Sequence, residues 1–475
     1  MTCRMLLPMA SALAAVVALT ACGAPSRAAA FADVADEVDA RGAGRIHWHR
    51  GGPEDDAVAR ELHELLRREL TADDAVRIAL LANRRLQAVY EDVGVAQADL
   101  VQAGLLRNPV LDAEARFIPG GGVDLELSLV QGFLDLVFIP MRRRMAEAAL
   151  EAAKRRVAGA VIDVAGDVRR AAYAYQAATQ ALDMRRTIVE ATAASFELAQ
   201  RIHAAGNSTA LDLAEQRLLV EEATGELHAA EADAGALRER LTALMGLWGA
   251  DTAWTMAVRL PDPPAAEAPD DGVERRAVEA SLALAAAKQD VAVAAQRLGV
   301  ARPLDVFDDG GVGVSAERSP EGEWAAGPAV SVPLPLFSRG QGAVLAARSD
   351  LRRAEAVYQA TAVEVRSRAR LAAARVRAAR GRMTHLVETM IPLRQAIVDR
   401  LQEEYNGMLA SPFRLIEAKR RQIDAGARYV EALGSYWSAR SALDQILMGG
   451  APPLIDSAAR GEAADGRGTG EGAHR

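Results

Sequence analysis

The residues with the clearest potential for chemistry are His47-Trp48-His49. Side chains at positions i and i+2 share one face of an extended segment, so both imidazoles would be able to reach one metal ion. The other histidines, including His203 and His385, are scattered, so we interpret the pair as structural and predict no metal site or cofactor. The Gly-x-Ser-x-Gly, His-Glu-x-x-His and paired Cys/His patterns of enzymes are absent, and we therefore predict no enzymatic activity.

The two cysteines concern targeting rather than redox chemistry. Cys3 and Cys22 both lie at the N-terminus, which leaves none for a disulfide framework or a cysteine metal site in the body of the chain. One positive charge, Arg4, precedes the apolar run Leu13–Leu19. This pattern predicts a secretory signal peptide over residues 1–21, too short to span a membrane as a helix.

The end of that segment, Leu19-Thr-Ala-Cys22, resembles a bacterial lipobox. The resemblance implies that Cys22 becomes the acylated first residue of the mature protein, and Gly23 after it implies sorting to the outer membrane. Cleavage among Ala28-Ala29-Ala30 is the alternative. No later stretch reaches the roughly 18 apolar residues of a transmembrane helix, so any membrane crossing by the body requires strands.

The composition predicts long helices packed through small side chains. The chain has 475 residues, of which 50% are hydrophobic, 25% charged and only 4% aromatic. Large rings dominate most globular cores, so several conventional cores are not expected. The net charge of −8 argues against nucleic acid as a partner.

Alternating segments predict four β-strands. Residues 110–117 and 123–130 alternate in polarity around Gly120-Gly121-Gly122, and residues 311–319 and 324–336 form a second pair. Along residues 123–130 one side of the predicted strand is apolar, and we expect this side to face lipid. Its members are Val123, Leu125, Leu127 and Leu129.

Helical periodicity occupies most of the remaining sequence. A helix is predicted from Thr71 to Leu106, and another from Gly272 to Leu298 that Arg302-Pro303 stops. The uninterrupted register from Met141 to Ala205 corresponds to a rod about 100 Å long. A second rod begins near Gln341 and should kink at Pro392; each rod is followed by a turn and a returning helix.

The two halves of the chain repeat one order of elements. Leu150-Glu-Ala-Ala153 corresponds to Leu351-Arg-Arg-Ala354, and the turn at Gly206 corresponds to the turn at Gly407. The predicted boundaries are a signal peptide 1–21, a lipid-anchored segment 22–70, a first repeat 71–260, a linker 261–271, a second repeat 272–448 and a disordered tail 449–475.

Four strands cannot close a membrane barrel, whereas three chains would supply twelve. Alanine-rich rods also need close neighbours along their length. The predicted fold is therefore mainly α with a small β part: duplicated long-helix coiled-coil hairpins form a trimeric α-helical barrel, and four strands per chain contribute to a shared 12-stranded transmembrane β-barrel.

Local motifs in this duplicated order resemble the TolC-like outer membrane efflux protein family. The matching segments are Gln102–Pro109 before the first strand, Gly327–Phe337 with Ser338–Gly342 before the second rod, and the turns Gly206–Glu215 and Gly407–Glu417. The resemblance covers residues 71–448. Each motif is short, and their duplicated order carries most of the likeness.

The resemblance implies a homotrimeric channel-tunnel that passively conducts drugs or heavy-metal cations. Its implied partners are an inner-membrane pump, a periplasmic adaptor and outer membrane lipid, and its location is the outer membrane with an extension into the periplasm. Acidic rings close the periplasmic tips of the family. Here Asp212 and Glu215 occupy the first tip, while Arg414 and Glu417 occupy the matching positions of the second. Arg/Glu pairs between chains, or simply solvated charges, are the two interpretations.

Two alternatives remain open from the sequence. A type I protein-secretion duct would share nearly every feature, because the substrate is selected mostly by the pump. A non-conducting structural lipoprotein that bridges the envelope would use the rods but has no need for strands with one apolar face.

Overall fold

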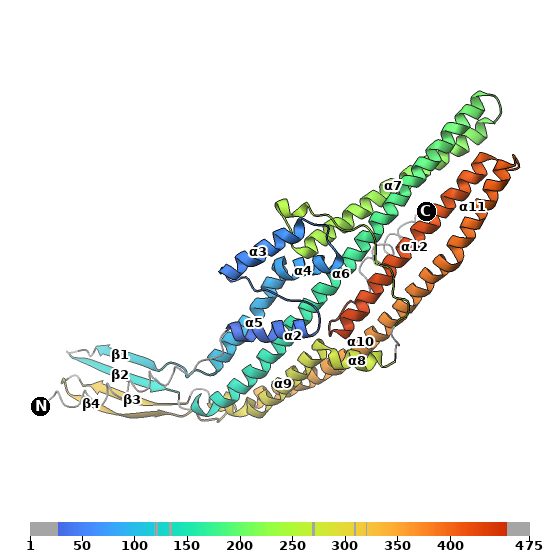
Figure 1. Ribbon diagram of the computed structural model, residues 1–475. Coiled ribbons are helices and arrows are strands. Elements are labelled where there is room, and N and C mark those ends of the chain that lie inside the picture. The colour runs from blue at the N-terminus through green and yellow to red at the C-terminus, as the bar shows by residue number, and fades with distance from the viewer. Residues whose placement is uncertain are drawn as a thin grey trace, which may run out of the picture. The chain divides into compact units, whose positions relative to one another are not determined.

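The computed structural model describes residues 27–117, 119, 122–132, 135–267, 271–307, 310–319 and 321–453. The chain is mostly helical with one four-stranded sheet (Figure 1). Its residues form two compact units. Of the described residues, the sheet unit contains those within 27–36, Tyr90–Val157 and Ala286–Val357, and the helical unit contains those within Glu37–Val89, Ala158–Ala285 and 358–453. Among the described helices, none combines the length and hydrophobicity that a membrane span requires.

The sheet is antiparallel and follows the chain in the order β1-β2-β3-β4. Its strands are β1 (Val110–Phe117), β2 (Val123–Gln131), β3 (Gly311–Arg318) and β4 (Trp324–Ser331). The predicted strands are confirmed almost residue for residue, except that β4 is shorter than expected. Pro333 and Pro335 follow β4, and proline cannot donate a ladder hydrogen bond.

The first repeat begins with α4 (Ala72–Ala82) and α5 (Arg84–Ala103), where the sequence predicted one helix. Thr71 and Asp74 form the expected capping box of α4. The helix is interrupted at Asn83, whose side chain replaces backbone hydrogen bonds. Its Oδ1 accepts from the backbone N–H of Arg85 (2.8 Å) and so caps the start of α5, and its Nδ2 donates to the carbonyl of Leu244 (2.7 Å). After β1 and β2 come the long helix α6 (Asp135–Ala204) and its return α7 (Ala210–Met245).

The second repeat follows the same order. It contains α8 (Val273–Ala280), α9 (Leu282–Phe307), β3, β4, α10 (Gln341–His385), α11 (Ile391–Asn406) and the return helix α12 (Pro412–Leu447). The predicted stop at Arg302-Pro303 is wrong, since α9 continues to Phe307. Proline removes one hydrogen bond but does not prevent later residues from being helical. The predicted irregularity at Pro392 is confirmed as a π-helical turn, Leu386–Met390, immediately before it.

Small side chains form much of the core of the helical unit. One cluster joins α10 to α12 through buried alanines such as Ala369, Ala373 and Ala432, around the fully buried Tyr436. Gly434 lets α12 approach α6 closely, because a Cβ atom there would lie 2.5 Å from the Cβ of Ala177. Alanine and glycine therefore set short distances between helices, as the composition predicted.

The linker between the repeats is fastened by a charged cluster. Glu267 accepts hydrogen bonds from Tyr436, from Arg380 (3.0 Å) and from Arg440 (2.6 Å). Burial alone would raise the pKa of Glu267, but these hydrogen bonds and the nearby guanidinium charges lower it below its ordinary value of 4.5. The linker thus lies against α10 and α12; residues 268–270 fall outside the described part.

Short helices α2 (Arg27–Ala40) and α3 (Pro53–Leu66) precede the first repeat. Arg41, just after α2, donates to the carbonyls of Ala280 and Met448, both at 2.7 Å. The chain remains packed slightly beyond the predicted end of the second repeat, because the N–H of Ala451 donates to Asp163 at 2.7 Å. The predicted signal peptide, Cys22 and residues 454–475 of the predicted tail lie outside the described residues.

Candidate functional site

The register of the sheet gives it one apolar face. Leu127 pairs with Ala113 on β1 and with Ala316 on β3, and directly paired residues point to the same side. Extending this register places two polar residues, Gln131 and Arg318, at the ends of that face. Its other fifteen residues are apolar: Leu111, Ala113, Ala115, Phe117, Val123, Leu125, Leu127, Leu129, Val312, Val314, Ala316, Trp324, Ala326, Pro328 and Val330. The four residues predicted from β2 all belong to this face, along one of the two inner strands.

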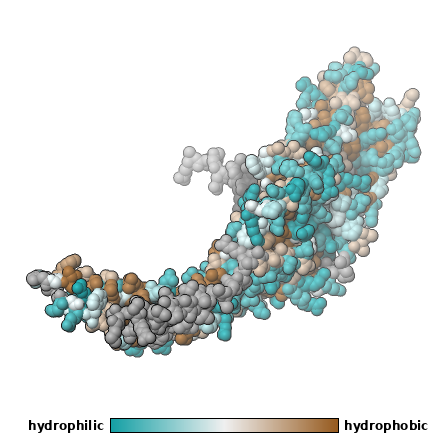
Figure 2. All heavy atoms as spheres, turned by 60° about the vertical axis from the view of Figure 1, so that its left-hand side comes forward, coloured by the Kyte–Doolittle hydropathy of each residue, from teal (hydrophilic) through white to brown (hydrophobic). Residues whose placement is uncertain are grey.

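Most large side chains of this face are exposed to solvent, while Leu125 and Leu127 are half-buried. Phe117 is 80% exposed, Val330 is 69% exposed and Leu111 is 68% exposed. In Figure 2, hydrophobic residues gather over the strands at the left of the view. An apolar patch of this extent is typical of a surface that contacts lipid or another chain.

The opposite face of the sheet is polar. Arg116 forms ion pairs with Glu114 at 2.9 Å and with Glu126 at 3.5 Å, and the hydroxyl of Ser128 lies 3.4 Å from Asp112. Strands that alternate apolar and polar residues are suited to separate lipid from water. The strands β1 and β4 are the two edges of this sheet, and each therefore presents a row of backbone groups that the sheet itself does not pair.

The first helical tip, between α6 and α7, has a regular glycine turn. Gly206 adopts φ +78°, its N–H donates to the carbonyl of His203, and the N–H of Asn207 donates to that of Ile202. These two bonds form a Schellman motif, in which glycine occupies the left-handed position without steric cost.

The second tip, between α11 and α12, forms the same motif with a different residue. The N–H of Met408 donates to Tyr405 and that of Leu409 to Glu404, and Met408 is the one non-glycine residue of positive φ (+57°) in the described chain. Met408 therefore matches Gly206, so the sequence alignment with Gly407 was shifted by one residue. Gly407 has an ordinary φ of −81°. The sequence contains the evidence for this shift of the alignment, because the second repeat has one inserted residue before Leu415.

Two of the four charged residues predicted at the tips form hydrogen bonds or ion pairs with residues near them in the sequence. Asp212 caps α7, since its carboxylate accepts from the N–H (2.9 Å) and the hydroxyl (2.7 Å) of Thr209. These bonds lower the pKa of Asp212 below 3.8. Glu417 binds Arg420 at 2.7 Å and Arg421 at 2.6 Å, and the hydrogen bond from Arg420 chiefly lowers its pKa.

The other two tip charges, Glu215 and Arg414, are exposed. Neither side chain has an ion-pair partner among the described residues. An Arg414–Glu417 pair between chains would compete with two existing ion pairs of Glu417. The structure thus singles out Glu215 and Arg414 as the tip charges available to another molecule.

Sequence reasoning missed one residue near the histidines of the N-terminal segment. Asp55, from the first turn of α3, brings its carboxylate to His47 and His49. The pattern Gly51-Gly-Pro-Glu-Asp55, a turn followed by an acidic first helical turn, was the available signal.

Comparison with known proteins agrees with this architecture. The profile of the outer membrane efflux protein family matches residues 140–247. The cobalt-zinc-cadmium resistance protein CzcC of Cupriavidus metallidurans is 24% identical over 387 residues, which are 80% of this chain and 90% of that protein.

Solved structures share the fold. The CmeC outer membrane channel of Campylobacter jejuni superimposes with a TM-score of 0.64 at 13% identity, over 82% of this chain and 88% of its own. The outer membrane protein VceC of Vibrio cholerae gives a TM-score of 0.59 at 18% identity, over 83% and 97%. The sequence motifs, the duplicated helices and the four-stranded sheet therefore agree: this chain is similar in sequence to the outer membrane efflux proteins and shares the fold of the solved outer membrane channels.

Proposed function

We propose that this protein is the outer membrane channel-tunnel of a tripartite efflux system. The observation that carries the proposal is the four-stranded sheet with a solvent-exposed apolar face and a charged opposite face. Such a sheet is stable in a bilayer when its apolar face meets lipid and its polar face lines water.

The open edges support a trimer. Lipid offers no hydrogen-bond partner for the backbone groups of β1 and β4, so these edges must pair with other chains. Three copies would supply twelve strands, an even number within the range of closed membrane sheets. The alanine-rich helices would pack against the same neighbours and surround a shared lumen.

The tips are suited to dock a periplasmic adaptor. Met408 is 95% exposed, Leu409 is 81% exposed, and Leu211 on the first tip is 67% exposed. A methionine held at positive φ costs roughly 1–2 kcal/mol relative to glycine. Nothing in the packing of the described chain offsets this cost, whereas an adaptor that covers the methionine would.

For the transported substrate, the relative named for cobalt, zinc and cadmium resistance supports divalent metal cations, with drugs as the other class. The energy would come from an inner-membrane pump, and conduction through this chain would be passive. We further propose that Cys22 carries the lipid anchor. Acyl labelling of the wild-type chain and its loss in Cys22→Ala would test the anchor without testing conduction.

Single-channel recording of the purified trimer in a planar bilayer tests the duct. We expect conductance that increases in Arg414→Gln and changes cation selectivity in Glu215→Gln, because these charges stand at the tip. Glu190→Gln, an exposed glutamate on α6, serves as the control and should match the wild type.

Absence of any conductance from the wild type and from both tip variants would contradict the duct and favour a structural lipoprotein. Conductance that is identical in all four proteins would retain the duct but remove Glu215 and Arg414 from its entrance.

A further inference from the structure

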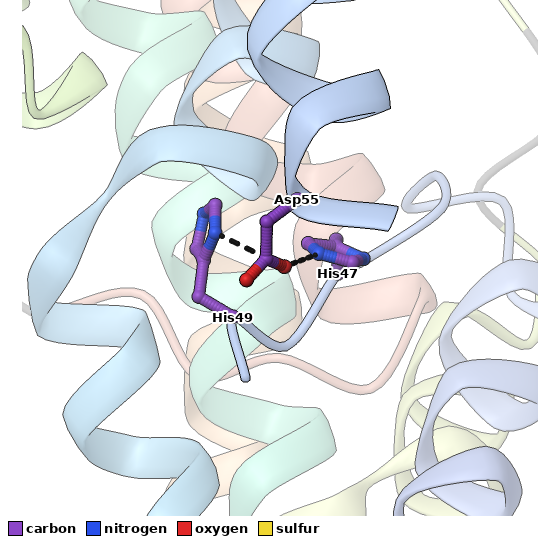
Figure 3. Close-up of side chains that lie close together, drawn as sticks. All are labelled: His47, His49 and Asp55. Atoms are coloured by element: carbon purple, nitrogen blue, oxygen red, sulfur yellow. Dashed lines mark hydrogen bonds and ion pairs between the residues drawn. The ribbon is translucent and has the colours of Figure 1, made fainter. Parts of the chain in front are cut away.

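Three side chains of the N-terminal segment bring donor atoms to one point. His47 and His49 come from the loop between α2 and α3, and Asp55 comes from the first turn of α3. The carboxylate lies between the two rings (Figure 3), with Asp55 Oδ1 2.6 Å from His47 Nε2 and 3.5 Å from His49 Nδ1. All three donor atoms lie within 4.8 Å of one another.

The carboxylate of Asp55 is oriented by the backbone. Its other oxygen, Oδ2, accepts from the N–H groups of Arg50 (3.0 Å), Gly51 (2.6 Å) and Gly52 (3.3 Å). These bonds use Oδ2 and leave Oδ1 directed toward the histidines. A carboxylate held in this way needs little reorganisation to accept a further ligand.

Hydrogen bonds to other residues hold the two histidines in position as well. His49 Nε2 lies 3.0 Å from the carbonyl of Leu81, so this nitrogen donates a proton to the carbonyl, and in the neutral ring Nδ1 is the nitrogen that can bind a metal. Gln87 of α5 fixes the backbone of both histidines, because it donates to the carbonyl of His47 and accepts from the N–H of His49, each at 2.9 Å. Metal-binding histidines commonly show this arrangement, with the second ring nitrogen bonded to a carbonyl.

The geometry points to a binding site for a divalent transition-metal ion, for which we propose Zn²⁺ as the best match. Two imidazole nitrogens and one carboxylate oxygen are ligands that Zn²⁺ prefers, and three protein ligands leave a fourth position for water. The side chains of His47, His49 and Asp55 are 16%, 25% and 19% exposed, so an ion has access from solvent.

Little movement separates the present arrangement from a tetrahedral site. Ligand atoms about 2.0–2.1 Å from Zn²⁺ lie roughly 3.3–3.5 Å apart, and the pair Asp55 Oδ1–His49 Nδ1 already has this spacing. His47 would replace its short contact with Asp55 by a bond to the metal and release a proton. The ion would then fasten the loop 47–49 to the first turn of α3.

The competing interpretation is a helix cap with an ion pair and no metal. The hydrogen bond from His47, together with those from Gly51 and Gly52, lowers the pKa of Asp55 well below its ordinary range even though burial opposes this. A cap of this kind stabilises the loop whether or not metal is present. The two interpretations differ in whether added metal changes affinity and stability.

The test uses the full-length chain in detergent, freed of metal with a chelator. Zn²⁺ is titrated in competition with a chromophoric chelator of known affinity, and thermal unfolding is followed with and without Zn²⁺. We expect one Zn²⁺ per chain and a higher melting temperature with Zn²⁺. His47→Gln and His49→Gln should each weaken binding by more than the roughly 10–100-fold that loss of an outer partner costs.

The matched control is His63→Gln, which removes an exposed histidine of the same helix α3 and should bind like the wild type. Both site variants keep Asp55 and its cap, so their circular dichroism without metal should be unchanged. Absence of stoichiometric binding by the wild type, or equal affinity in both site variants and the wild type, would overturn the proposal. Because the site is independent of conduction, neither result bears on the duct.

Discussion

At the scale of single residues, equivalent positions in the two repeats have acquired different roles. Gly206 and Met408 occupy the same left-handed position of two Schellman motifs, yet only glycine adopts it without cost. Asp212 serves as a cap, whereas Arg414 at the matching position is exposed and Ser411 caps α12 with its hydroxyl. Local helix chemistry thus determines which tip charges remain available.

Met408→Gly should raise the stability of the second tip. Removing the positive-φ cost gains about 1–2 kcal/mol, and the greater freedom of glycine in the unfolded chain returns about 0.4–1 kcal/mol of it. The exposed side chain loses no packing. The apparent melting temperature at a fixed scan rate measures the effect, since membrane proteins often unfold irreversibly.

Gly206→Ala is the paired control for this position and should lower the melting temperature. If Met408→Gly leaves the melting temperature unchanged or lowers it, methionine is not strained in this turn and the argument for a covering partner weakens.

At the scale of elements, small residues decide how closely the helices pack. Helix α12 carries two glycines that face α6: Gly434 opposite Ala177, and Gly426 opposite the flexible side chain of Met184. Substituting alanine at each of these two positions therefore separates the effect of helix propensity on stability from the effect of packing.

Gly434→Ala should destabilise the helical unit by up to about 2 kcal/mol. Its new Cβ would lie 2.5 Å from that of Ala177, and overpacking of about 1–3 kcal/mol exceeds the helix-propensity gain of about 1 kcal/mol. Gly426→Ala has ordinary contacts at 3.6 Å to Met184 and should be neutral or stabilising. Thermal unfolding of both variants, followed by circular dichroism, provides the comparison. Equal effects at the two positions would show that propensity alone governs α12.

At the scale of the whole molecule, the described chain leaves several surfaces uncovered. These surfaces are the apolar face of the sheet, the edges of β1 and β4, and the exposed tips, and the proposed function assigns lipid, other copies or a partner to each of them. Exposed apolar patches and unpaired strand edges of this kind favour contact with lipid or with other chains.

Leu127→Arg should prevent insertion of the sheet, because an arginine on the lipid face costs about 2–4 kcal/mol near the bilayer centre in each chain. Ser128→Arg places the same side chain on the polar face, close to Asp112, and should be tolerated. Flotation of the reconstituted protein with liposomes, together with the yield of trimer, measures insertion. Similar losses for the two variants would contradict the assignment of the faces.

Periodicity predicted the elements well where local sequence decides the outcome. Alternation along Val123–Val130 located β2, and Pro392 marked the irregular turn before α11. It failed at Asn83, which ends a periodic helix where its amide reaches the carbonyl of Leu244, a distant contact. It also failed at Pro303, because one lost hydrogen bond does not end α9. Propensity is a local preference, and tertiary contacts of a few kcal/mol override it.

The sequence by itself determined the duplicated order of helices and strands, the apolar side of β2 and the likeness to an efflux family, because all three follow from residue spacing along the chain. Only the tertiary structure decided that fifteen apolar residues from four strands share one face, that Met408 rather than Gly407 matches Gly206, and that Asp55 meets His47 and His49. Strand register, turn geometry and side-chain convergence depend on distances between residues that periodicity does not specify.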